Sequence, residues 1–365
     1  MIPVLKPTID EQTKEELLKV LDSGWWGAGP KTEEFEQEFA KYVGVKYAVA
    51  VNSGTTALDL CLKAYSIKTG ELITTPMTFV SDAIVGEWNG LEVTFADVDR
   101  DSLCLDPNSL IITDKTKAII VVDSHGRLAD IEGIRKIATT TEQGIANSPL
   151  IIEDAAHAMF TPGVGKGDIV VWSFQAVKTL PAGDGGMITT NSEVIYNRLR
   201  KLTWLGVERN TYQRASAKKY TWDYDISQAD AIKGYMNDLT AVICLGQLRR
   251  LEETNANRRA IQAAYNEAFR EMPQIKIPAF SHTVQYYTGE FKNRDNLAGY
   301  LAEKGIATSV HFKPLSEMTY WKKAVKRPLP VTNKVWKNLL TLPVYHSLTW
   351  SQVEYIIKCI KEFYA

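Results

Sequence analysis

Long hydrophobic runs are missing from this 365-residue sequence. No segment approaches the roughly 20 consecutive apolar residues that a membrane-spanning helix requires. Residues 1–25 carry charged side chains throughout and contain no apolar core of the length that a secretory signal peptide needs. We therefore expect a soluble, cytoplasmic protein that does not enter a membrane.

Cysteine is also scarce, and the four cysteines are far apart, with no CxxC pair: Cys61, Cys104, Cys244 and Cys359. This spacing favours buried thiols over a disulfide framework or a metal site. The five histidines show no HExxH or other ligand spacing. The sequence therefore predicts no metal centre.

Neither sign of charge is in excess, because 42 Lys and Arg oppose 43 Asp and Glu, for a formal net charge of -1. A basic surface of the kind that binds nucleic acid or anionic lipid is therefore not expected. The composition, 45% hydrophobic and 23% charged, is typical of a globular protein with a large buried core.

What the sequence does contain is a series of short apolar runs, most of them separated by helical segments. We predict seven strands of a largely parallel α/β sheet covered by helices on both faces. The predicted strands are residues 47–51, 71–75, 92–98, 118–122, 150–154, 168–174 and 186–190. Short strands and helices mix in the last ninety residues, so we assign residues 1–245 to a large domain and 246–365 to a small C-terminal α+β lobe. No GxGxxG follows the first strand, which argues against a nucleotide-binding Rossmann protein.

Helical periodicity flanks the predicted sheet on both sides. Leu17, Leu18 and Leu21 lie on one face of an expected N-terminal helix, and a second helix is expected to end at Gly44. Residues 243–269 have the pattern of one long amphipathic helix.

The first chemically suggestive segment follows the first strand. Ser53, Gly54 and Thr55 open an apolar helix, where free backbone N–H groups and the helix dipole favour an anion such as phosphate. An ordinary Ser or Thr N-cap is the alternative, and this segment alone does not decide between them.

Asp154 ends the fifth predicted strand, and His157 follows it. In such sheets, ligands bind outside the carboxyl ends of the strands. A carboxylate there either pairs with a protonated ring nitrogen of a cofactor or caps a helix. His157 lies three residues further, on the same side of a helical turn, where it either faces a ligand or is a buried structural histidine.

Lys178 follows the sixth strand and precedes a glycine-rich loop. Burying an ammonium group is unfavourable unless the amine is neutral or joined to an aldehyde, and a catalytic lysine becomes nucleophilic in the same way. Ser173, five residues earlier, can place a hydroxyl on a cofactor phosphate. A surface lysine at a strand-to-loop junction is the alternative.

Phe79 follows the second strand, where it either stacks on a planar ring or packs in the core. Each of these signals is modest by itself. Their order at successive strand ends, however, matches one known arrangement.

The sequence resembles the DegT/DnrJ/StrS-type family of sugar aminotransferases, which depend on pyridoxal 5'-phosphate (PLP) and have PLP fold type I, the aspartate aminotransferase-like architecture. The likeness runs from the first ten residues to the last twenty. The segments IIEDAAHA, WSFQAVK and GDGGMITT resemble the family's cofactor blocks, and GIATSVHFKPL resembles its C-terminal lobe. The resemblance implies an α/β fold with a mostly parallel seven-stranded sheet.

The resemblance also implies a role for each matching residue. Lys178 would form the Schiff base with PLP and act as the catalytic acid/base. Asp154 would hold the pyridine nitrogen, His157 the phenolic oxygen, and Phe79 would stack on the ring. The phosphate would be held by Ser53, Gly54, Thr55 and Ser173.

The activity implied is ping-pong transamination, with L-glutamate as amino donor and a keto-sugar nucleotide, aminated at C3 or C4, as acceptor. We expect His311 and Lys313, just before Pro314, at the substrate entrance, and an ordinary surface pair is the alternative. Related sugar dehydratases replace the lysine with histidine, so Lys178 argues against them, whereas aromatising relatives keep it and stay open. The intact Lys178 and Asp154 argue against a non-catalytic regulatory homologue.

Family members usually form homodimers in which the partner chain completes each active site, here near residues 233–237. Lys233 is the nearest match to the asparagine that usually contacts the phosphate. Further departures from the family pattern occur at Leu205, at Ser316 and in residues 123–131. They leave the cofactor chemistry intact and point to an unusual sugar.

Overall fold

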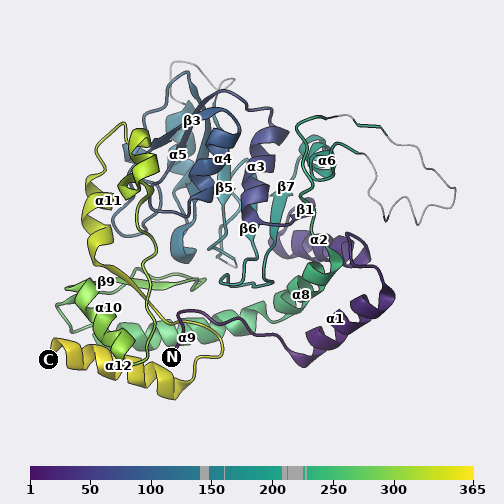
Figure 1. The fold of residues 1–365 in the computed structure, drawn as a ribbon. Coiled ribbons are helices and arrows are strands. Elements are labelled where there is room, and N and C mark those ends of the chain that lie inside the picture. Colours follow the sequence, from purple (N-terminus) through teal and green to yellow (C-terminus); the bar gives the residue numbers. More distant parts are fainter. Residues whose placement is uncertain (140–147, 160, 208–211, 213–224, 227) are drawn as a thin grey trace.

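The structure, a computed structural model, describes residues 1–139, 148–159, 161–207, 212, 225–226 and 228–365. A sheet covered by helices forms the upper part of the molecule in Figure 1, and a smaller unit of helices and short strands lies below it, close to both chain ends. This is the mixed α/β architecture with a small C-terminal α+β lobe that the sequence predicts.

The large sheet contains all seven predicted strands. Its order is β1-β7-β6-β5-β4-β2-β3, and only β7 runs antiparallel to its neighbours. The strands are β1 (Tyr47–Val51), β2 (Gly70–Thr74), β3 (Leu91–Phe95), β4 (Thr116–Val122), β5 (Leu150–Asp154), β6 (Ile169–Ser173) and β7 (Gly186–Thr190). β3 ends at Phe95 rather than at residue 98, because Val98 forms an isolated bridge with Leu105.

Helices cover both faces of the sheet, because successive side chains of each strand point to opposite sides. The helices on one face are α3 (Gly54–Ala64), α4 (Ser81–Trp88) and α6 (Glu193–Leu202). The helices on the other face are α2 (Pro30–Val43), α5 (Ile131–Thr139) and α8 (Asp238–Arg249). Both faces are therefore buried, which leaves the strand ends as the place for a site.

The N-terminal helix α1 (Glu11–Ser23) packs on α8. Its buried side chains are Thr13 and Val20, whereas Leu18 and Leu21 of the expected leucine face are 59% and 40% exposed. Helical periodicity marks an apolar stripe but does not tell whether another element covers it.

The amphipathic helical stretch expected over residues 243–269 is helical, but it is divided into two helices. α8 ends at Arg249, and α9 (Leu251–Phe269) begins after Arg250, whose backbone has φ -101° and ψ 1°. The break has a packing reason: α8 belongs to the core beneath the large sheet, and α9 belongs to the core of the small lobe.

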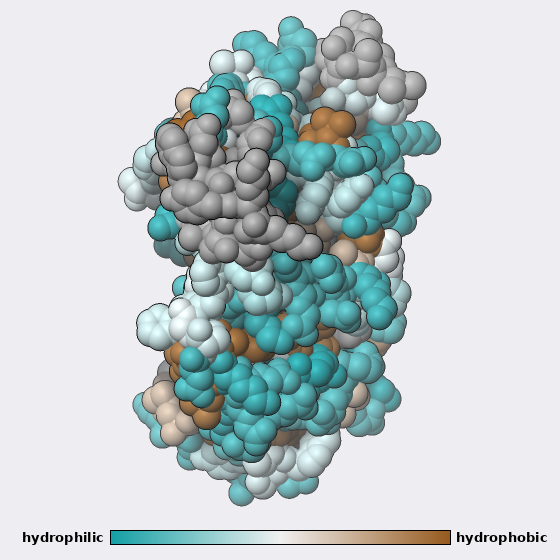
Figure 2. All heavy atoms as spheres, turned by 90° about the vertical axis from the view of Figure 1, so that its right-hand side faces the viewer, coloured by the Kyte–Doolittle hydropathy of each residue, from teal (hydrophilic) through white to brown (hydrophobic). Residues whose placement is uncertain are grey.

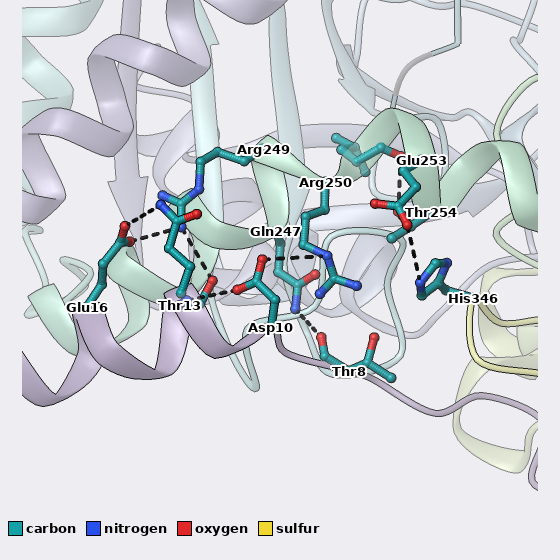
Figure 3. Close-up of polar contacts among 12 residues, drawn as sticks. Thr8, Asp10, Thr13, Glu16, Gln247, Arg249, Arg250, Glu253, Thr254 and His346 are labelled. Atoms are coloured by element: carbon teal, nitrogen blue, oxygen red, sulfur yellow. Dashed lines mark hydrogen bonds and ion pairs between the residues drawn. The ribbon is translucent and has the colours of Figure 1, made fainter.

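The segment before α1 contacts this junction, as Figure 3 shows. Gln247 Nε2 donates a hydrogen bond of 2.6 Å to the carbonyl oxygen of Thr8, and Arg250 lies 3.7 Å from the Asp10 carboxylate. The N-terminal segment therefore joins the part of the chain where the two cores meet.

The small lobe contains a three-stranded antiparallel sheet of order β10-β9-β8. Its strands and α-helices are β8 (Ile275–Lys276), β9 (Tyr287–Phe291), α10 (Arg294–Glu303), α11 (Pro330–Val335), β10 (Leu339–Leu342) and α12 (Trp350–Tyr364). The 3-10 helices of the chain are η1 (Pro107–Ser109), η2 (Ser124–Gly126), η4 (Leu315–Glu317), η5 (Thr319–Ala324) and η6 (Trp336–Asn338). From this lobe the chain returns to the large sheet, where Leu315 and Trp321 join its core and Trp321 packs edge-on against Phe95. None of the helices in the described part of the chain has the length and apolarity of a membrane span.

The close contact of α1 with α8 gives a test of this packing. A Cβ on Gly246 would lie 1.9 Å from Thr13 Oγ1, so Gly246→Ala is expected to lower the free energy of unfolding by about 1–2 kcal/mol through overpacking. The matched control is Gly299→Ala on α10, where a Cβ meets no atom within 4 Å and should stabilise the helix by about 0.5–1 kcal/mol. Urea denaturation followed by circular dichroism measures both changes. Equal stability of Gly246→Ala and wild type would contradict the α1–α8 contact.

Candidate active site

All eight residues that the sequence predicts around the cofactor line one cavity of about 590 Å³. It lies at the carboxyl ends of the parallel strands, on the side of the small lobe. That lobe contributes Tyr286, His311 and Phe312 to its wall. The predicted residues in the lining are Ser53, Gly54, Thr55, Phe79, Asp154, His157, Ser173 and Lys178. The fold thus brings together residues from four segments, which end or follow β1, β2, β5 and β6.

One end of the cavity is formed by the start of α3. Ser53 is the N-cap, and its hydroxyl accepts a hydrogen bond of 3.0 Å from the backbone N–H of Thr56. The Ser53 cap leaves the first N–H groups of the helix, those of Gly54 and Thr55, without helical partners, because the first turn of any helix lacks them. The cap and the anion site are therefore compatible.

Two glycines allow the first strand to approach the sixth at this point. Gly186 of β7 lies between Val51 and Ser173, and a Cβ there would lie 2.6 Å from the carbonyl oxygen of Ser53. A Cβ on Gly54 would lie 3.0 Å from Ser173 Cβ. The helix start and the Ser173 hydroxyl consequently form one cradle of hydrogen-bond donors.

Asp154 ends β5 and is 6% exposed. Its Oδ1 accepts a hydrogen bond of 2.9 Å from the backbone N–H of Ala156, which fixes the orientation of the carboxyl group. The remaining part of the group lines the cavity. Asp154 therefore accepts the local hydrogen bond of a cap and also borders the cavity.

His157 is enclosed by aromatic rings from the small lobe. Its ring stacks on Phe312 with 5.8 Å between centroids and an interplanar angle of 9°, and it meets the edge of Tyr286. Burial, and then the charge of Lys178, lower its pKa well below the usual range, so the imidazole is neutral. Its Nδ1 is buried and has no hydrogen-bond partner in the described part of the chain.

Lys178 lies in the loop between β6 and β7. The loop is fixed by hydrogen bonds from Ala176 N–H to the Gly183 oxygen (2.7 Å), and from the Gln285 side chain to the Val177 oxygen (2.7 Å). Burial lowers the pKa of Lys178 to about 8, although Asp154 and Asp82 oppose this change by favouring the ammonium form. At pH 7 roughly a tenth of the amine is then neutral and nucleophilic, far more than for a lysine with the usual pKa.

Phe79 and the two residues expected at the substrate entrance differ in position. Phe79 is 59% exposed and belongs to the lining of the cavity. His311 lies in the cavity wall, its ring stacked on Tyr286 with 3.8 Å between centroids, and burial lowers its pKa to about 4. Lys313 is exposed and does not belong to the described residues that line the cavity.

The structure adds buried groups that the sequence did not reveal. His125 is 2% exposed, donates from Nε2 to the His311 carbonyl oxygen (2.9 Å), and contacts the Ser124 hydroxyl through Nδ1 (2.6 Å). Asp82 lies beneath the cavity, where its carboxyl group contacts that of Asp154. The unusual residues 123–131 were the only sequence signal for His125, and no sequence pattern indicated Asp82.

The positions of other departures are also defined. Lys233 lies over the ring of Trp204, with 5.7 Å from Nζ to the centroid, and Leu205 is 47% exposed with a φ of 54°. A phosphate contact of Lys233 across a dimer interface stays a prediction. In the described part of the chain, no three His, Cys, Asp or Glu side chains are grouped as they are around a metal ion.

Comparisons with known proteins agree with this arrangement. Residues 7–361 match the model of the DegT/DnrJ/EryC1/StrS aminotransferase family. The chain is 33% identical to the spore coat polysaccharide biosynthesis protein SpsC of Bacillus subtilis (strain 168), over 99% of this chain and 96% of that protein.

Solved structures with the same fold include the sugar aminotransferase CalS13 of Micromonospora echinospora. It has a TM-score of 0.89 and 28% identity, over 99% of this chain and 100% of that one. The Streptococcus pneumoniae protein Spr1654, solved in a PMP form and a PLP form, reaches 0.90 and 28% for the PMP form, over 99% and 98% of the two chains. The chain therefore belongs to the DegT/DnrJ/EryC1/StrS family, and it is an aminotransferase.

Proposed function

We propose that the protein transfers an amino group from L-glutamate to a nucleotide-linked keto-sugar, at C3 or C4, with PLP bound to Lys178. The observation that carries the proposal is the Lys178 amine, with a pKa of about 8, facing Asp154 across a cavity that ends in a cradle of donors. A carboxylate, a nucleophilic amine and an anion site in one cavity are the three groups that PLP chemistry requires.

The residues present fit the cofactor on two structural grounds. The cradle of Ser53, Gly54 and Ser173 is open only because Gly54 and Gly186 lack side chains, and it presents N–H and hydroxyl donors to a phosphate. The buried Nδ1 of His157 lacks a partner in the described residues, and the phenolic oxygen of PLP would supply one. PLP, when bound, supplies an electron sink that stabilises negative charge at the substrate carbon.

The chain's own residues divide the chemistry between them. Lys178 would hold the cofactor and would move the proton at Cα of the amino donor through its Nζ, and a pKa near 8 suits both directions of transfer. Asp154 would hold the pyridine nitrogen by accepting its hydrogen bond. His157, neutral because of burial, leaves the charge balance of the cavity unchanged.

The acceptor would lie against the wall from the small lobe. Tyr286 stacked on His311 offers an aromatic and polar surface to a sugar ring, and Lys313 lies outside the lining, where it is available for a nucleotide phosphate. The words "sugar aminotransferase" for CalS13 and "polysaccharide biosynthesis" for SpsC support a sugar substrate. The departures at Leu205 and Ser316 favour a sugar that differs from the common ones.

The active enzyme would be a cytoplasmic homodimer. Exposed leucines on α1, Leu18 and Leu21, support an interface with a second copy. Figure 2, which views the face that carries α1, shows hydrophobic atoms among hydrophilic ones in its lower part. Lys233 would reach the phosphate of the partner's site.

Absorption spectroscopy of the PLP-loaded protein tests the proposal. L-Glutamate is expected to bleach the visible band and to yield 2-oxoglutarate, whereas D-glutamate, of identical composition, leaves the band unchanged. The bleached protein is then offered a panel of keto-sugar nucleotides, of which one restores the band and gains an amine. A sugar that loses water without gaining nitrogen would instead assign the protein to the dehydratase or aromatising reactions of the same scaffold.

A further inference from the structure

A second carboxyl group is buried beneath the cavity. Asp82, in the first turn of α4, is 0% exposed. The Thr78 hydroxyl donates a hydrogen bond to its Oδ2. Its Oδ1 is buried and has no hydrogen-bond partner among the residues that the structure describes. A buried oxygen without a donor is unfavourable for a carboxylate, but it suits a carboxylic acid whose hydroxyl is itself a donor.

The neighbour of this carboxyl group is Asp154, which lies within hydrogen-bonding reach. Two carboxylates in such contact repel each other strongly at low dielectric, so a pair of this kind retains one proton. Burial, and then the charge of Asp154, raise the pKa of Asp82 well above its usual range.

The proton belongs on Asp82 rather than on Asp154. Asp154 already accepts the backbone N–H of Ala156 and borders the cavity. Asp82 is fully enclosed and has the unpartnered oxygen. The titratable groups that interact with the pair from neighbouring elements are Lys178, in the loop after β6, the Cys61 thiol of α3, and Asp123, directly after β4.

We propose that Asp82 is a protonated positioning residue, which donates a hydrogen bond to Asp154 and holds that carboxylate toward the cofactor ring. The consequence is that the pair of carboxyl groups carries a single negative charge instead of two. This inference rests on the proposed role of Asp154 toward PLP. It adds a second fixed donor to Asp154, besides the Ala156 N–H.

The chain offers a matched control on the opposite face of β5. Asp123 is also 0% exposed, its Oδ1 accepts from Ala129 N–H at 2.9 Å, and its Oδ2 has no partner in the described residues. Its neighbour Glu153 binds the N–H groups of Gly165 and Gly167 instead of facing the cavity. Burial, and then Glu153, raise the pKa of Asp123 as well.

Infrared spectroscopy of the cofactor-free protein, with isotope-labelled aspartate, tests the proton directly. Near neutral pH the wild type is expected to show carbonyl bands of protonated aspartic acids, and Asp82→Asn loses one of them. Asp123→Asn loses a different band and keeps that of Asp82. If Asp82→Asn kept every carbonyl band of the wild type, the proposal would be overturned. If Asp123→Asn showed no such band, the proposal would also be overturned, and this second result remains usable even if Asp82→Asn does not fold.

A kinetic experiment compares two substitutions of Asp82 in the PLP-loaded enzyme. Asparagine keeps a donor toward Asp154 and an acceptor for Thr78, so Asp82→Asn is expected to retain kcat within about 3-fold. Asp82→Ala removes the donor and should lower kcat about 10-fold, the scale of a lost hydrogen bond to a charged group. Equal loss in both variants would mean that a charge on Asp82 matters, which overturns the proposal. The infrared result does not depend on PLP, so a wild type that fails to transaminate would refute the proposed function alone.

Discussion

Lys178→Ala is expected to reduce turnover by about four orders of magnitude or more, the scale on which removal of a catalytic nucleophile acts. In the proposed function, the substitution removes the amine that would condense with an aldehyde and carry the proton, because both tasks are assigned to the same Nζ. The fold should persist, because Lys178 lies in a loop fixed by backbone hydrogen bonds and by Gln285. Single-turnover reaction with L-glutamate measures the loss, and circular dichroism checks the fold.

Lys178→Arg is the matched control, since it keeps the positive charge but not the nucleophile, and it should be equally inactive. A small primary amine such as ethylamine is expected to restore part of the activity to Lys178→Ala, whose shortened side chain leaves room for it, and none to Lys178→Arg. Undiminished half-reaction activity in Lys178→Ala would refute the assignment.

Asp154→Asn is expected to lower kcat by about 100- to 1,000-fold while PLP remains bound, the scale of removing one fixed electrostatic group. An amide no longer stabilises the protonated pyridine nitrogen, but its oxygen still accepts from Ala156 N–H. The phosphate cradle of Ser53, Gly54 and Ser173 is untouched and retains the cofactor. Turnover and the PLP dissociation constant are measured on the same preparation.

Glu153→Gln provides the control for this substitution. Glu153 precedes Asp154 on β5, but its oxygens bind the N–H groups of Gly165 and Gly167 on the opposite face of the sheet. We expect it to affect stability rather than kcat. Equal losses of turnover and of PLP binding in Asp154→Asn would make the role of Asp154 mainly structural.

The sequence predicted the large sheet and the cavity lining for a common physical reason. Buried strands are continuous apolar runs, so all seven were visible, and the six strands that run in the same direction place the segments after them at one edge. Ser53, Asp154 and Ser173 each follow or end such a run. Their meeting in one cavity is thus a consequence of strand direction, which sequence patterning reveals.

Other features depend on contacts between distant segments. His125 and His311 meet across 186 residues of sequence, and the burial of Asp82 follows from the packing of α4 against the sheet. The break at Arg250 exists because α8 and α9 serve different cores, which a continuous helical period conceals. Secondary-structure propensity and hydrophobic periodicity describe residues that are close in sequence. They contain no information about contacts between distant segments.

The return of the chain from the small lobe to the large sheet bears on how such a protein can change over evolution. Leu315 and Trp321 belong to the sheet's core although they come from beyond residue 245, and Tyr286 and His311 form part of the cavity wall. The C-terminal portion therefore cannot be exchanged as an independent unit, because recombination at the helix junction would replace packing in the sheet's core and part of the cavity wall in one step. Point substitutions in the wall change the shape of the cavity without this disturbance of the core.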